Sequence, residues 1–321
     1  MKGAILLGID VGGTNIKLMA ADRDRRVLAK RSIRTQSELG YERVSDAIIT
    51  NLESMLWEAN ARQADVAAVG MGLPGIVDAE NRRSIHLAYV GWNGFDPCEK
   101  IAAYFGVPHA IDNDANLSAL GEYAFETGEP ASSLVLLTLG TGLGGGVVVD
   151  GRIFGGSKNL ACEFGHMTVT PDAEETCLCG RKGCWEAYCS GSAMAAHAKG
   201  LMAAHPKSAL HQLVAGNGRE YDNRLIGPGA LAGDAACLEA LRRFNYYLAI
   251  GCANVMKLFN PDIFLLGGGL SGLGDLIFSP VNRDVVPRLL HERQYCPIRP
   301  ARLGPEAGMY GAVALAGLVA G

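Results

Sequence analysis

The segment IDNDAN (111–116) contains residue types that suit proton transfer from a hydroxyl group. It places Asn113 and Asp114 where a strand is expected to end and a helix to begin. A carboxylate there can accept a hydroxyl proton while the neighbouring amide holds a second hydroxyl. The alternative is that both residues only cap the helix, which Asn and Asp favour intrinsically. Taken alone, the segment favours the cap.

Two glycine-rich turns have the composition of loops that wrap phosphate groups. The first, in GIDVGGTNIK (8–17), offers Asp10, Gly12, Gly13, Thr14 and Asn15, and the second, in LGTGLGGG (139–146), offers Gly140, Thr141, Gly142 and Gly144. Glycine lets backbone N–H groups approach phosphate oxygens, and an adjacent carboxylate can hold a metal-bound water. One such turn also suits an ordinary hairpin, whereas two suit a nucleotide triphosphate held from two sides. Neither is a Walker A loop or a dinucleotide fingerprint, because each leads to a strand and no Gly-Lys-Ser/Thr occurs.

The segment HMTVTPDAEETCLCGRKGCWEAYCSG (166–191) contains a cluster of metal-binding residue types. His166, Cys177, Cys179 and Cys184 make the closed set of four ligands that is typical of structural zinc, whereas a catalytic zinc keeps an open position. A nucleic-acid finger would need a further ligand pair and a basic helix, which this segment lacks. We expect the nearby Cys162 to be a plain buried thiol, and the absence of any metal remains the alternative.

The composition of the chain excludes several functional classes of protein. The chain has 321 residues, 49% of them hydrophobic, which allows two domains with their own cores. A formal net charge of −4 gives no general attraction to nucleic acid. The N-terminal apolar stretch reaches Asp10 too soon for a signal peptide, and no segment has the ~20 apolar residues of a membrane span. Nine cysteines, an odd number, suit a reducing compartment. We therefore expect a cytoplasmic protein that binds neither nucleic acid nor membranes.

The elements that must position these residues alternate along the chain. Short strands at 3–10, 15–22 and 26–33 predict an antiparallel meander. The next elements are predicted as a helix over about 41–60, a strand that enters a Gly/Pro loop within 66–75, and a strand within 107–116 that runs into a helix starting near Asp114. Later elements are predicted as a strand–turn–strand unit at 133–151, a helix over about 234–259, a strand at 262–269 and a helix over about 306–319. Residues 204–233 predict little beyond helix and loop. Because the unit at 133–151 echoes the first two strands, we expect an internal duplication that presents both glycine turns to one cleft.

Five motifs occur in the order and spacing of the ROK family, which the chain resembles from Gly8 to about Gly317. They are D-x-G-G-T-x-x-K at Asp10–Lys17, N-D-A-N at Asn113–Asn116, G-T-G-x-G-G-G at Gly140–Gly146, E-x-G-H at Glu163–His166 and C-x-C-G-x-x-G-C-x-E at Cys177–Glu186. The family comprises bacterial sugar kinases and sugar-responsive repressors. The resemblance implies an α/β fold of the actin-like ATPase type, which is a duplicated ribonuclease H-like unit with two lobes around a central cleft. We expect a small lobe at 1–112 plus 305–321 and a large lobe with the zinc site at 113–304.

The resemblance also implies roles for the motif residues. Asp114 would be the general base that takes the proton from the sugar hydroxyl attacking the γ-phosphate of ATP. Gly75, Asn113, Glu163, His166 and Glu186 would bind the sugar. The two glycine turns would hold the ATP phosphates, with Asp10 near Mg²⁺, and Gly268 and Gly269 in LLGGGLSG (265–272) would lie against the adenosine. His166 would serve both the zinc and the sugar, so the structural zinc would stiffen one wall of the sugar pocket.

The resemblance predicts a sugar kinase, a phosphotransferase with an alcohol group as acceptor. It implies phosphorylation of a hexose at the 6-position, with glucose as the leading substrate. Ala88 stands near the position where many glucose kinases of the family have an asparagine, so N-acetylglucosamine, N-acetylmannosamine, allose and fructose remain alternatives. A sugar-binding sensor without catalysis is a further alternative. A repressor is not expected, because only nine residues precede Asp10 and leave no room for a helix-turn-helix. The resemblance suggests a homodimer or homotetramer.

Overall fold

The computed structural model describes residues 4–87, 90–125, 131–211 and 226–321. Contacts between residues divide the chain into two compact units. Unit 1 comprises Met1–Leu134, Gly146–Cys162 and Arg302–Gly321, and unit 2 comprises Val135–Gly145 and Glu163–Ala301. The lobes expected at 1–112 plus 305–321 and at 113–304 are a separate prediction, which concerns the two lobes on either side of the active-site cleft.

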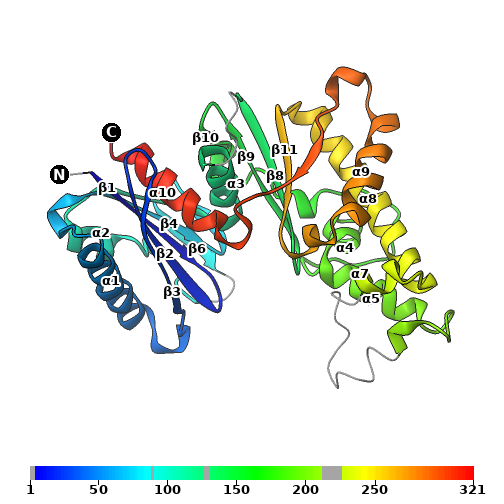
Figure 1. The fold of residues 1–321 in the computed structure, drawn as a ribbon, viewed down its shortest axis with the longest axis horizontal. Helices are drawn as coiled ribbons and strands as arrows, with labels where there is room; N and C mark the ends of the chain where they lie inside the picture. Colours follow the sequence, from blue (N-terminus) through cyan, green and yellow to red (C-terminus); the bar gives the residue numbers. More distant parts are fainter. Residues whose placement is uncertain (1–3, 88–89, 126–130, 212–225) are drawn as a thin grey trace. The chain divides into compact units, whose positions relative to one another are not determined.

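The strands form two five-stranded sheets and one hairpin (Figure 1). The first sheet has the order β3-β2-β1-β4-β7, with β1 at Ile5–Val11, β2 at Asn15–Asp22, β3 at Val27–Arg34, β4 at Val66–Leu73 and β7 at His109–Asn113. The second has the order β10-β9-β8-β11-β12, with β8 at Ser133–Leu139, β9 at Leu143–Val149, β10 at Arg152–Ile153, β11 at Ile263–Gly267 and β12 at Ile298–Pro300. The hairpin pairs β5, Gly75–Asp78, with β6, Arg83–Leu87.

The two sheets repeat one topology. In each sheet the earliest strand, β1 or β8, lies at the centre, the next two strands of the chain follow on one side, and later strands lie on the other. Antiparallel pairing joins β1, β2 and β3, as the predicted meander requires, and parallel pairing joins β1 to β4 and β4 to β7. In the second sheet β9 pairs antiparallel with β10, and β11 pairs parallel with β12. The predicted duplication and the actin-like α/β fold are therefore confirmed.

Helices cover both faces of the first sheet in unit 1. Side chains on a strand alternate between faces, so Leu7 and Ile9 of β1 pack with α1 (Tyr41–Glu58) and α2 (Glu99–Phe105). Leu6 points to the opposite face, where it packs with Val313 of α10 (Ala307–Val319). Because both faces are covered, β1 is buried along its whole length.

Glycines allow α10 to approach its neighbours closely. A Cβ on Gly70 of β4 would lie 2.0 Å from the carbonyl oxygen of Ala312, so only glycine fits between the sheet and the helix. The same holds where α10 crosses α3 (Asp114–Phe125), since a Cβ on Gly311 would lie 1.7 Å from the carbonyl oxygen of Leu117. This close crossing fixes α3, the helix whose first residue is Asp114.

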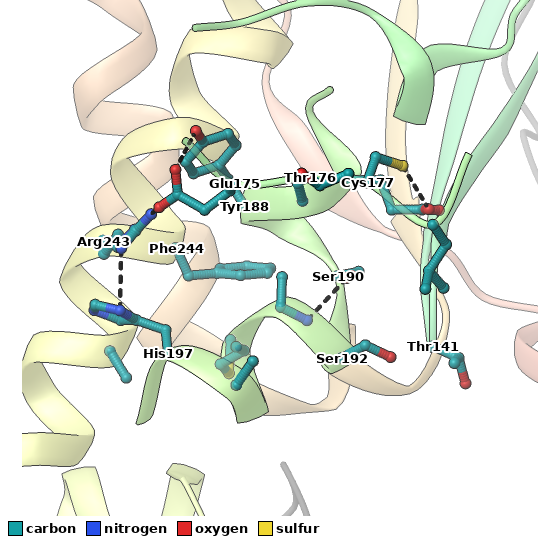
Figure 2. A pocket seen from close by; sticks show the side chains of 17 residues that line it. Thr141, Glu175, Thr176, Cys177, Tyr188, Ser190, Ser192, His197, Arg243 and Phe244 are labelled. Atoms are coloured by element: carbon teal, nitrogen blue, oxygen red, sulfur yellow. Dashed lines mark hydrogen bonds and ion pairs between the residues drawn. The ribbon is translucent and has the colours of Figure 1, made fainter. Parts of the chain in front are cut away.

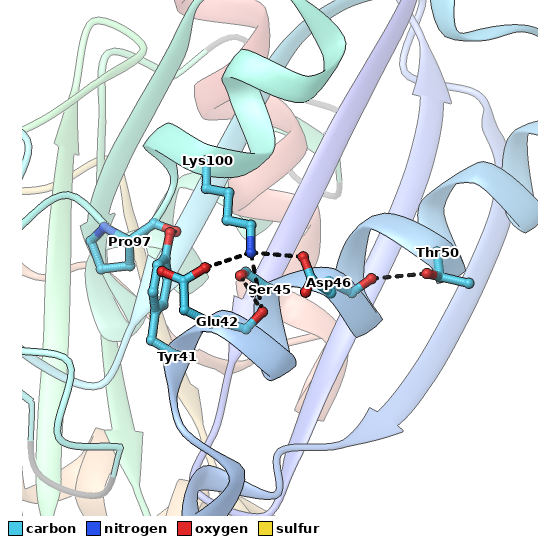
Figure 3. A network of polar contacts seen from close by, with 7 residues as sticks. All are labelled: Tyr41, Glu42, Ser45, Asp46, Thr50, Pro97 and Lys100. Carbon is cyan, nitrogen blue, oxygen red and sulfur yellow. Dashed lines mark hydrogen bonds and ion pairs between the residues drawn. The ribbon is translucent and has the colours of Figure 1, made fainter.

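On the surface of unit 1, ion pairs connect α1 and α2. The ammonium group of Lys100 lies 2.6 Å from a carboxylate oxygen of Glu42 and 2.7 Å from one of Asp46 (Figure 3). Solvent and salt screen exposed pairs of this kind, so the buried contacts of the sheet dominate the stability of this unit.

In unit 2 the longest helix, α8 (Ala235–Phe259), supports the segment that carries the cysteines. Trp185 is fully buried, and its indole N–H donates to the carbonyl oxygen of Tyr247 at 3.0 Å. A Cβ on Gly251 would lie 2.0 Å from the Trp185 ring. Shorter helices complete the described part of this unit: α4 at Glu186–Cys189, α5 at Gly191–Leu201, α7 at Ile226–Leu231 and α9 at Asp275–Val285.

Some predictions from sequence are confirmed and others require correction. The strand within 107–116 ends at Asn113 and α3 begins at Asp114, as predicted. The strand within 66–75 ends at Leu73, and Gly75 of the expected loop starts the hairpin strand β5. The helices α2, α5 and α9 were not predicted. The sequence favours packing over sugar stacking for the three tryptophans, Trp57, Trp92 and Trp185. Trp92 and Trp185 are buried, but Trp57 is 82% exposed and does not pack in the core. Within the described ranges, every helix is too short or too polar to cross a lipid bilayer.

Candidate active site and metal site

The carboxyl ends of three neighbouring parallel strands bring candidate residues together in unit 1. Asp10 of β1 is in register with Gly72 of β4, and Gly72 is in register with Asp112 of β7. Asn113 ends β7, and Asp114 begins α3 directly afterwards. Carboxyl ends of parallel strands are the edge at which open α/β sheets bind ligands. The parallel pairing therefore brings Asp10 and Asp114, which are 104 positions apart in the sequence, to one edge of the sheet.

Asn113 caps α3 and is anchored to the hairpin. Its side-chain oxygen accepts hydrogen bonds from the backbone N–H groups of Ala115 (2.8 Å) and Asn116 (3.2 Å). Its amide nitrogen donates to the carbonyl oxygen of Gly75 at 3.0 Å. The cap that the sequence suggested is thus present, and it leaves one amide hydrogen of Asn113 for a ligand.

Asp114 is poised for proton transfer near neutral pH. Desolvation and the adjacent charge of Asp10 raise the pKa of Asp114 to about 6. Burial also raises the pKa of Asp10, while Lys17, whose ammonium lies 3.2 Å from Asp10 Oδ2, opposes that shift. Gly308 of α10 leaves room for the Asp10 carboxylate, since a Cβ there would lie 2.8 Å from it. A carboxylate with this pKa is mostly ionised at pH 7 and is still a usable base.

The turn after β1 is a short hairpin with an exposed tip. The backbone N–H of Gly12 donates to the carbonyl oxygen of Asn15 at 3.0 Å, and the Thr35 hydroxyl donates to the carbonyl oxygen of Gly12 at 2.6 Å. Gly13, Thr14 and Asn15 are exposed. Their polar groups are therefore accessible to a ligand.

A buried network beneath the Asn113–Asp114 turn was not predicted from the sequence. The Asp112 carboxylate accepts hydrogen bonds from the Asn113 backbone (2.7 Å) and from the side chains of Asn116 (2.9 Å) and Asn159 (3.1 Å). Asn159 also donates to the carbonyl oxygen of Val77 in the hairpin at 3.1 Å. Desolvation raises the pKa of Asp112 even so. Asn159 lies 47 positions from Asp112, and no local motif marks that pairing.

The second glycine turn and the 268–269 loop lie together in unit 2. Gly140 and Gly142 close the turn between β8 and β9, where the Gly140 N–H donates to the Gly142 carbonyl at 3.0 Å. Gly268 has a φ of +82°, and a Cβ there would lie 2.4 Å from the carbonyl oxygen of Leu139, the last residue of β8. Glycine is required at 268 for both reasons. The exposed backbone of Gly269 then continues into a 3₁₀ turn.

The expected metal ligands are brought together in unit 2. One ligand atom from each of His166, Cys177, Cys179 and Cys184 lies within 4.8 Å of the others. The Sγ atoms of Cys179 and Cys184 are 3.7 Å apart, and Cys177 Sγ lies 3.7 Å from His166 Nδ1. Zinc–sulfur bonds of about 2.3 Å at tetrahedral angles place sulfurs about 3.8 Å apart. The donor set and its spacing therefore fit a structural zinc ion.

The remaining cysteines lie outside this cluster. Cys162 is half-buried, with its Sγ 3.6 Å from the carbonyl oxygen of Phe154, and Cys189 is buried against the carbonyl oxygen of Phe244 at 3.5 Å. All nine cysteines lie in the described ranges, and none forms a disulfide. Cys162 is thus a thiol outside the metal cluster, as expected, but it is half-buried and not buried.

The three acidic and imidazole groups expected to bind sugar in unit 2 have different surroundings. Glu163 and His166 are exposed at the two ends of a short 3₁₀ turn, in which the His166 N–H donates to the Glu163 carbonyl oxygen at 3.0 Å. Glu186 is partly buried, and its Oε2 accepts a hydrogen bond from the backbone N–H of Leu143 at 2.9 Å. Glu186 thus contacts the second glycine turn directly.

A cavity of about 510 Å³ lies beside the metal cluster in unit 2. Figure 2 shows Thr141 and Cys177 on one side of it and Arg243 and His197 on the other. Arg243 pairs with Glu175 and lies 3.1 Å from His197 Nδ1, so its charge is already compensated. Nothing in the sequence had indicated this cavity, because its walls come from separate segments.

Comparison with known proteins gives a consistent result. The model of the ROK family matches residues 6–318. A glucokinase of Streptomyces coelicolor is 33% identical over 317 residues, covering 97% of each chain. An N-acetyl-D-glucosamine kinase of Aliivibrio salmonicida is also 33% identical, covering 96% of this chain and 98% of its own. A ROK family glucokinase from Streptomyces griseus, solved in complex with glucose and AMPPNP, superposes with a TM-score of 0.75 at 33% identity, covering 97% of this chain and 99% of that one.

Proposed function

The chain belongs to the ROK family and is a sugar kinase, and on this premise we propose that it transfers the γ-phosphate of ATP to the 6-hydroxyl of a hexose. The observation that carries the proposal is Asp114. It begins α3 at the carboxyl edge of the first sheet, beside Asp10, and its pKa is raised to about 6. This is the position and protonation behaviour that a general base for a sugar hydroxyl requires.

In the proposed reaction, the 6-oxygen of the sugar attacks the γ-phosphorus while its proton passes to Asp114. The new oxygen–phosphorus bond forms as the bond between the γ-phosphorus and the bridging oxygen of ADP breaks, and ADP leaves with the electron pair. Little covalent work falls to the protein, so positioning and charge neutralisation dominate the rate. A Mg²⁺ ion bound with ATP would neutralise phosphate charge, and Asp10 is the residue proposed to lie near it.

The other roles follow the resemblance and remain proposals. Gly75, Asn113, Glu163, His166 and Glu186 are proposed to bind sugar hydroxyls. The phosphates are proposed to bind Gly12, Gly13, Thr14 and Asn15 and the turn with Gly140, Thr141, Gly142 and Gly144, with Gly268 and Gly269 against the adenosine. The exposed tips of these turns support the proposal. A zinc ion at the His166 cluster would stiffen the segment that presents Glu186.

Glucose is the leading proposed substrate, supported by similarity to glucokinases. Equal identity to an N-acetyl-D-glucosamine kinase keeps N-acetylhexosamines as the main alternative. Ala88, which led us to consider other hexoses, lies outside the described residues. Allose, fructose and a non-catalytic sugar-binding sensor complete the alternatives.

A release assay for ADP tests the proposal directly. Purified protein with Mg·ATP is supplied with glucose, mannose, allose, fructose, N-acetylglucosamine or N-acetylmannosamine. We expect ADP with glucose above the other sugars, and the position of the phosphate is read by NMR of the product. ADP release with an N-acetylhexosamine alone would replace glucose by that sugar. Sugar binding by calorimetry without ADP from any of the six would support the sensor instead.

Cellular setting and assembly are proposed on separate grounds. The free thiols of all nine cysteines suit a reducing compartment such as the cytoplasm. The family resemblance supports a homodimer or homotetramer, which sedimentation equilibrium measures. The two working lobes are proposed at 1–112 plus 305–321 and at 113–304.

A further inference from the structure

Glu186 lies between the metal cluster and the second glycine turn. Its Oε2 accepts a hydrogen bond from the Leu143 N–H at 2.9 Å, and Leu143 is the residue with which β9 begins after that turn. Its other oxygen, Oε1, lies 3.5 Å from the Sγ of Cys177, one of the expected metal ligands. A single carboxylate therefore contacts both sites.

Close packing restricts where this carboxylate can lie. A Cβ on Gly142 would be 2.4 Å from Glu186 Oε2, and a Cβ on Gly165 would be 3.4 Å from the Glu186 Cβ and 2.2 Å from the Leu143 carbonyl oxygen. Glycine at 142 and 165 thus makes the space that the Glu186 side chain fills. Because the fit is tight, a shift of Glu186 must displace the Gly140–Leu143 turn as well.

The turn and the metal-binding segment are also joined through the backbone. Cys184 precedes Glu186 by two residues. The backbone N–H of Trp185, which lies between them, donates to the Met167 carbonyl oxygen at 2.8 Å. Beyond α4, the Gly191 N–H donates to the Gly140 carbonyl oxygen at 2.8 Å. The segment from Cys184 to Gly191 is accordingly held by the metal cluster at one end and holds the turn at the other.

We propose that Glu186 is a positioning residue that couples metal binding at the His166 cluster to nucleotide binding at the Gly140–Gly144 turn. A metal ion fixes the cysteine segment and hence Glu186, and Glu186 holds the Leu143 N–H and preorganises the turn for phosphate. If the bound metal has already ordered the turn, nucleotide binding no longer bears the entropy cost of that ordering, so the nucleotide binds more tightly. The coupling is reciprocal, so nucleotide also tightens metal binding. This inference rests on the proposed function of the turn and adds to it a contact on the nucleotide side.

Calorimetry of nucleotide binding without sugar tests the coupling. The probe is adenylyl imidodiphosphate with Mg²⁺. It is titrated into two samples, zinc-loaded protein and zinc-free protein. The zinc-free sample is exchanged into metal-free buffer before Mg²⁺ is added. Loss of a hydrogen bond to a charged group weakens binding by about tenfold or more. We expect about that loss for Glu186→Ala, and a loss of similar size on zinc removal from unmodified protein. Glu186→Gln retains a side-chain oxygen for the Leu143 N–H and is expected to bind nucleotide within about threefold of unmodified protein.

Two further variants separate positioning from a general loss of structure. Glu174→Gln alters an exposed carboxylate in the segment that carries the cysteines, outside the proposed metal, sugar and nucleotide ligands, and is expected to leave nucleotide affinity unchanged. Gly142→Ala places a Cβ against the Glu186 carboxylate, so it is expected to weaken nucleotide binding less in the Glu186→Ala background than alone.

The outcomes are distinct. If zinc-loaded unmodified protein binds no nucleotide, the proposed function of the turn fails and the coupling fails with it. If it binds but Glu186→Ala binds equally well, the coupling is wrong while the kinase proposal stands. If zinc removal still weakens nucleotide binding by tenfold in Glu186→Ala, the metal acts by another route and Glu186 is not the link.

Discussion

The side-chain amide of Asn113 donates a hydrogen bond to the backbone carbonyl of Gly75 at 3.0 Å. The same side chain caps α3, so the hairpin and the start of the helix are held by one residue. Gly75 has a φ of +127°, and a Cβ there would lie 2.3 Å from the carbonyl oxygen of His86. The residue that precedes the proposed base is therefore positioned by a glycine 38 positions away.

Substitution of Gly75 is expected to destabilise the fold. Gly75→Ala combines an unfavourable φ with a backbone clash, and should lower the free energy of unfolding by about 3 kcal/mol. Gly106→Ala is the control, because Gly106 has a φ of +67° but open space around it, and should cost about 1 kcal/mol. Chemical denaturation measures both. Equal losses in the two variants would mean that the hairpin accommodates the new Cβ.

Removal of the proposed base should abolish turnover and spare binding. Asp114→Asn keeps the size of the side chain but cannot accept the proton, so kcat should fall by about a thousandfold. Sugar and nucleotide affinities, measured by calorimetry, should change by less than about threefold. A variant with kcat near that of the unmodified enzyme would exclude Asp114 as the base.

The activity of the unmodified enzyme should depend on the ionisation of Asp114. Because the pKa of this carboxyl is raised to about 6, kcat/KM should fall tenfold per pH unit well below pH 6 and level off above it. The measurement is a pH profile with saturating Mg·ATP. A profile without a break between pH 5 and 7 would show that this ionisation does not limit the reaction.

The same shift predicts a pH-dependent gain in stability for Asp114→Asn. A carboxyl whose folded pKa lies above its unfolded value of 3.8 destabilises the fold increasingly as pH rises from about 4 to about 6, and by a constant amount above that. Asp114→Asn removes this cost. Its Tm should therefore exceed that of the unmodified protein at pH 8, and the difference should shrink as the pH falls toward 4. A difference that is independent of pH would contradict the raised pKa.

The packing of Trp185 on Gly251 of α8 should tolerate no added methyl group. Gly251→Ala places a Cβ 2.0 Å from the buried Trp185 ring and should cost about 2 kcal/mol of unfolding free energy. Gly200→Ala is the matched helical control, since no atom lies within 4 Å of its added Cβ, and it should gain about 1 kcal/mol. A neutral Gly251→Ala would show that Trp185 can move.

Zinc removal should weaken sugar binding as well as nucleotide binding. His166 belongs to both the metal cluster and the proposed sugar ligands, so chelated protein that remains folded should have a sugar KM raised about tenfold, as for one lost bond to a charged group. Circular dichroism establishes that the chelated protein is folded. An unchanged sugar KM would separate the metal from the sugar site.

Much of the architecture was predictable, because the signals are local. Short β-rich runs separated by turn residues marked β1, β2 and β3, and a long helical stretch marked α8. The structure confirms these elements within one or two residues at most ends. The metal cluster was predictable for the same reason: three of its four members lie within eight positions, and their spacing allows them to converge around one point. The repeated strand–turn–strand unit predicted the internal duplication, which the matching orders of the two sheets confirm.

The sequence by itself thus determined much of the order of elements, the family and the residue types available for chemistry. Only the tertiary structure decided which distant groups meet: Asp112 with Asn159, and Leu143 with Glu186. Such pairs depend on how helices and strands pack in register, and a change of one residue in register redirects a side chain to the opposite face. Local spacing carries no information about that choice of partner.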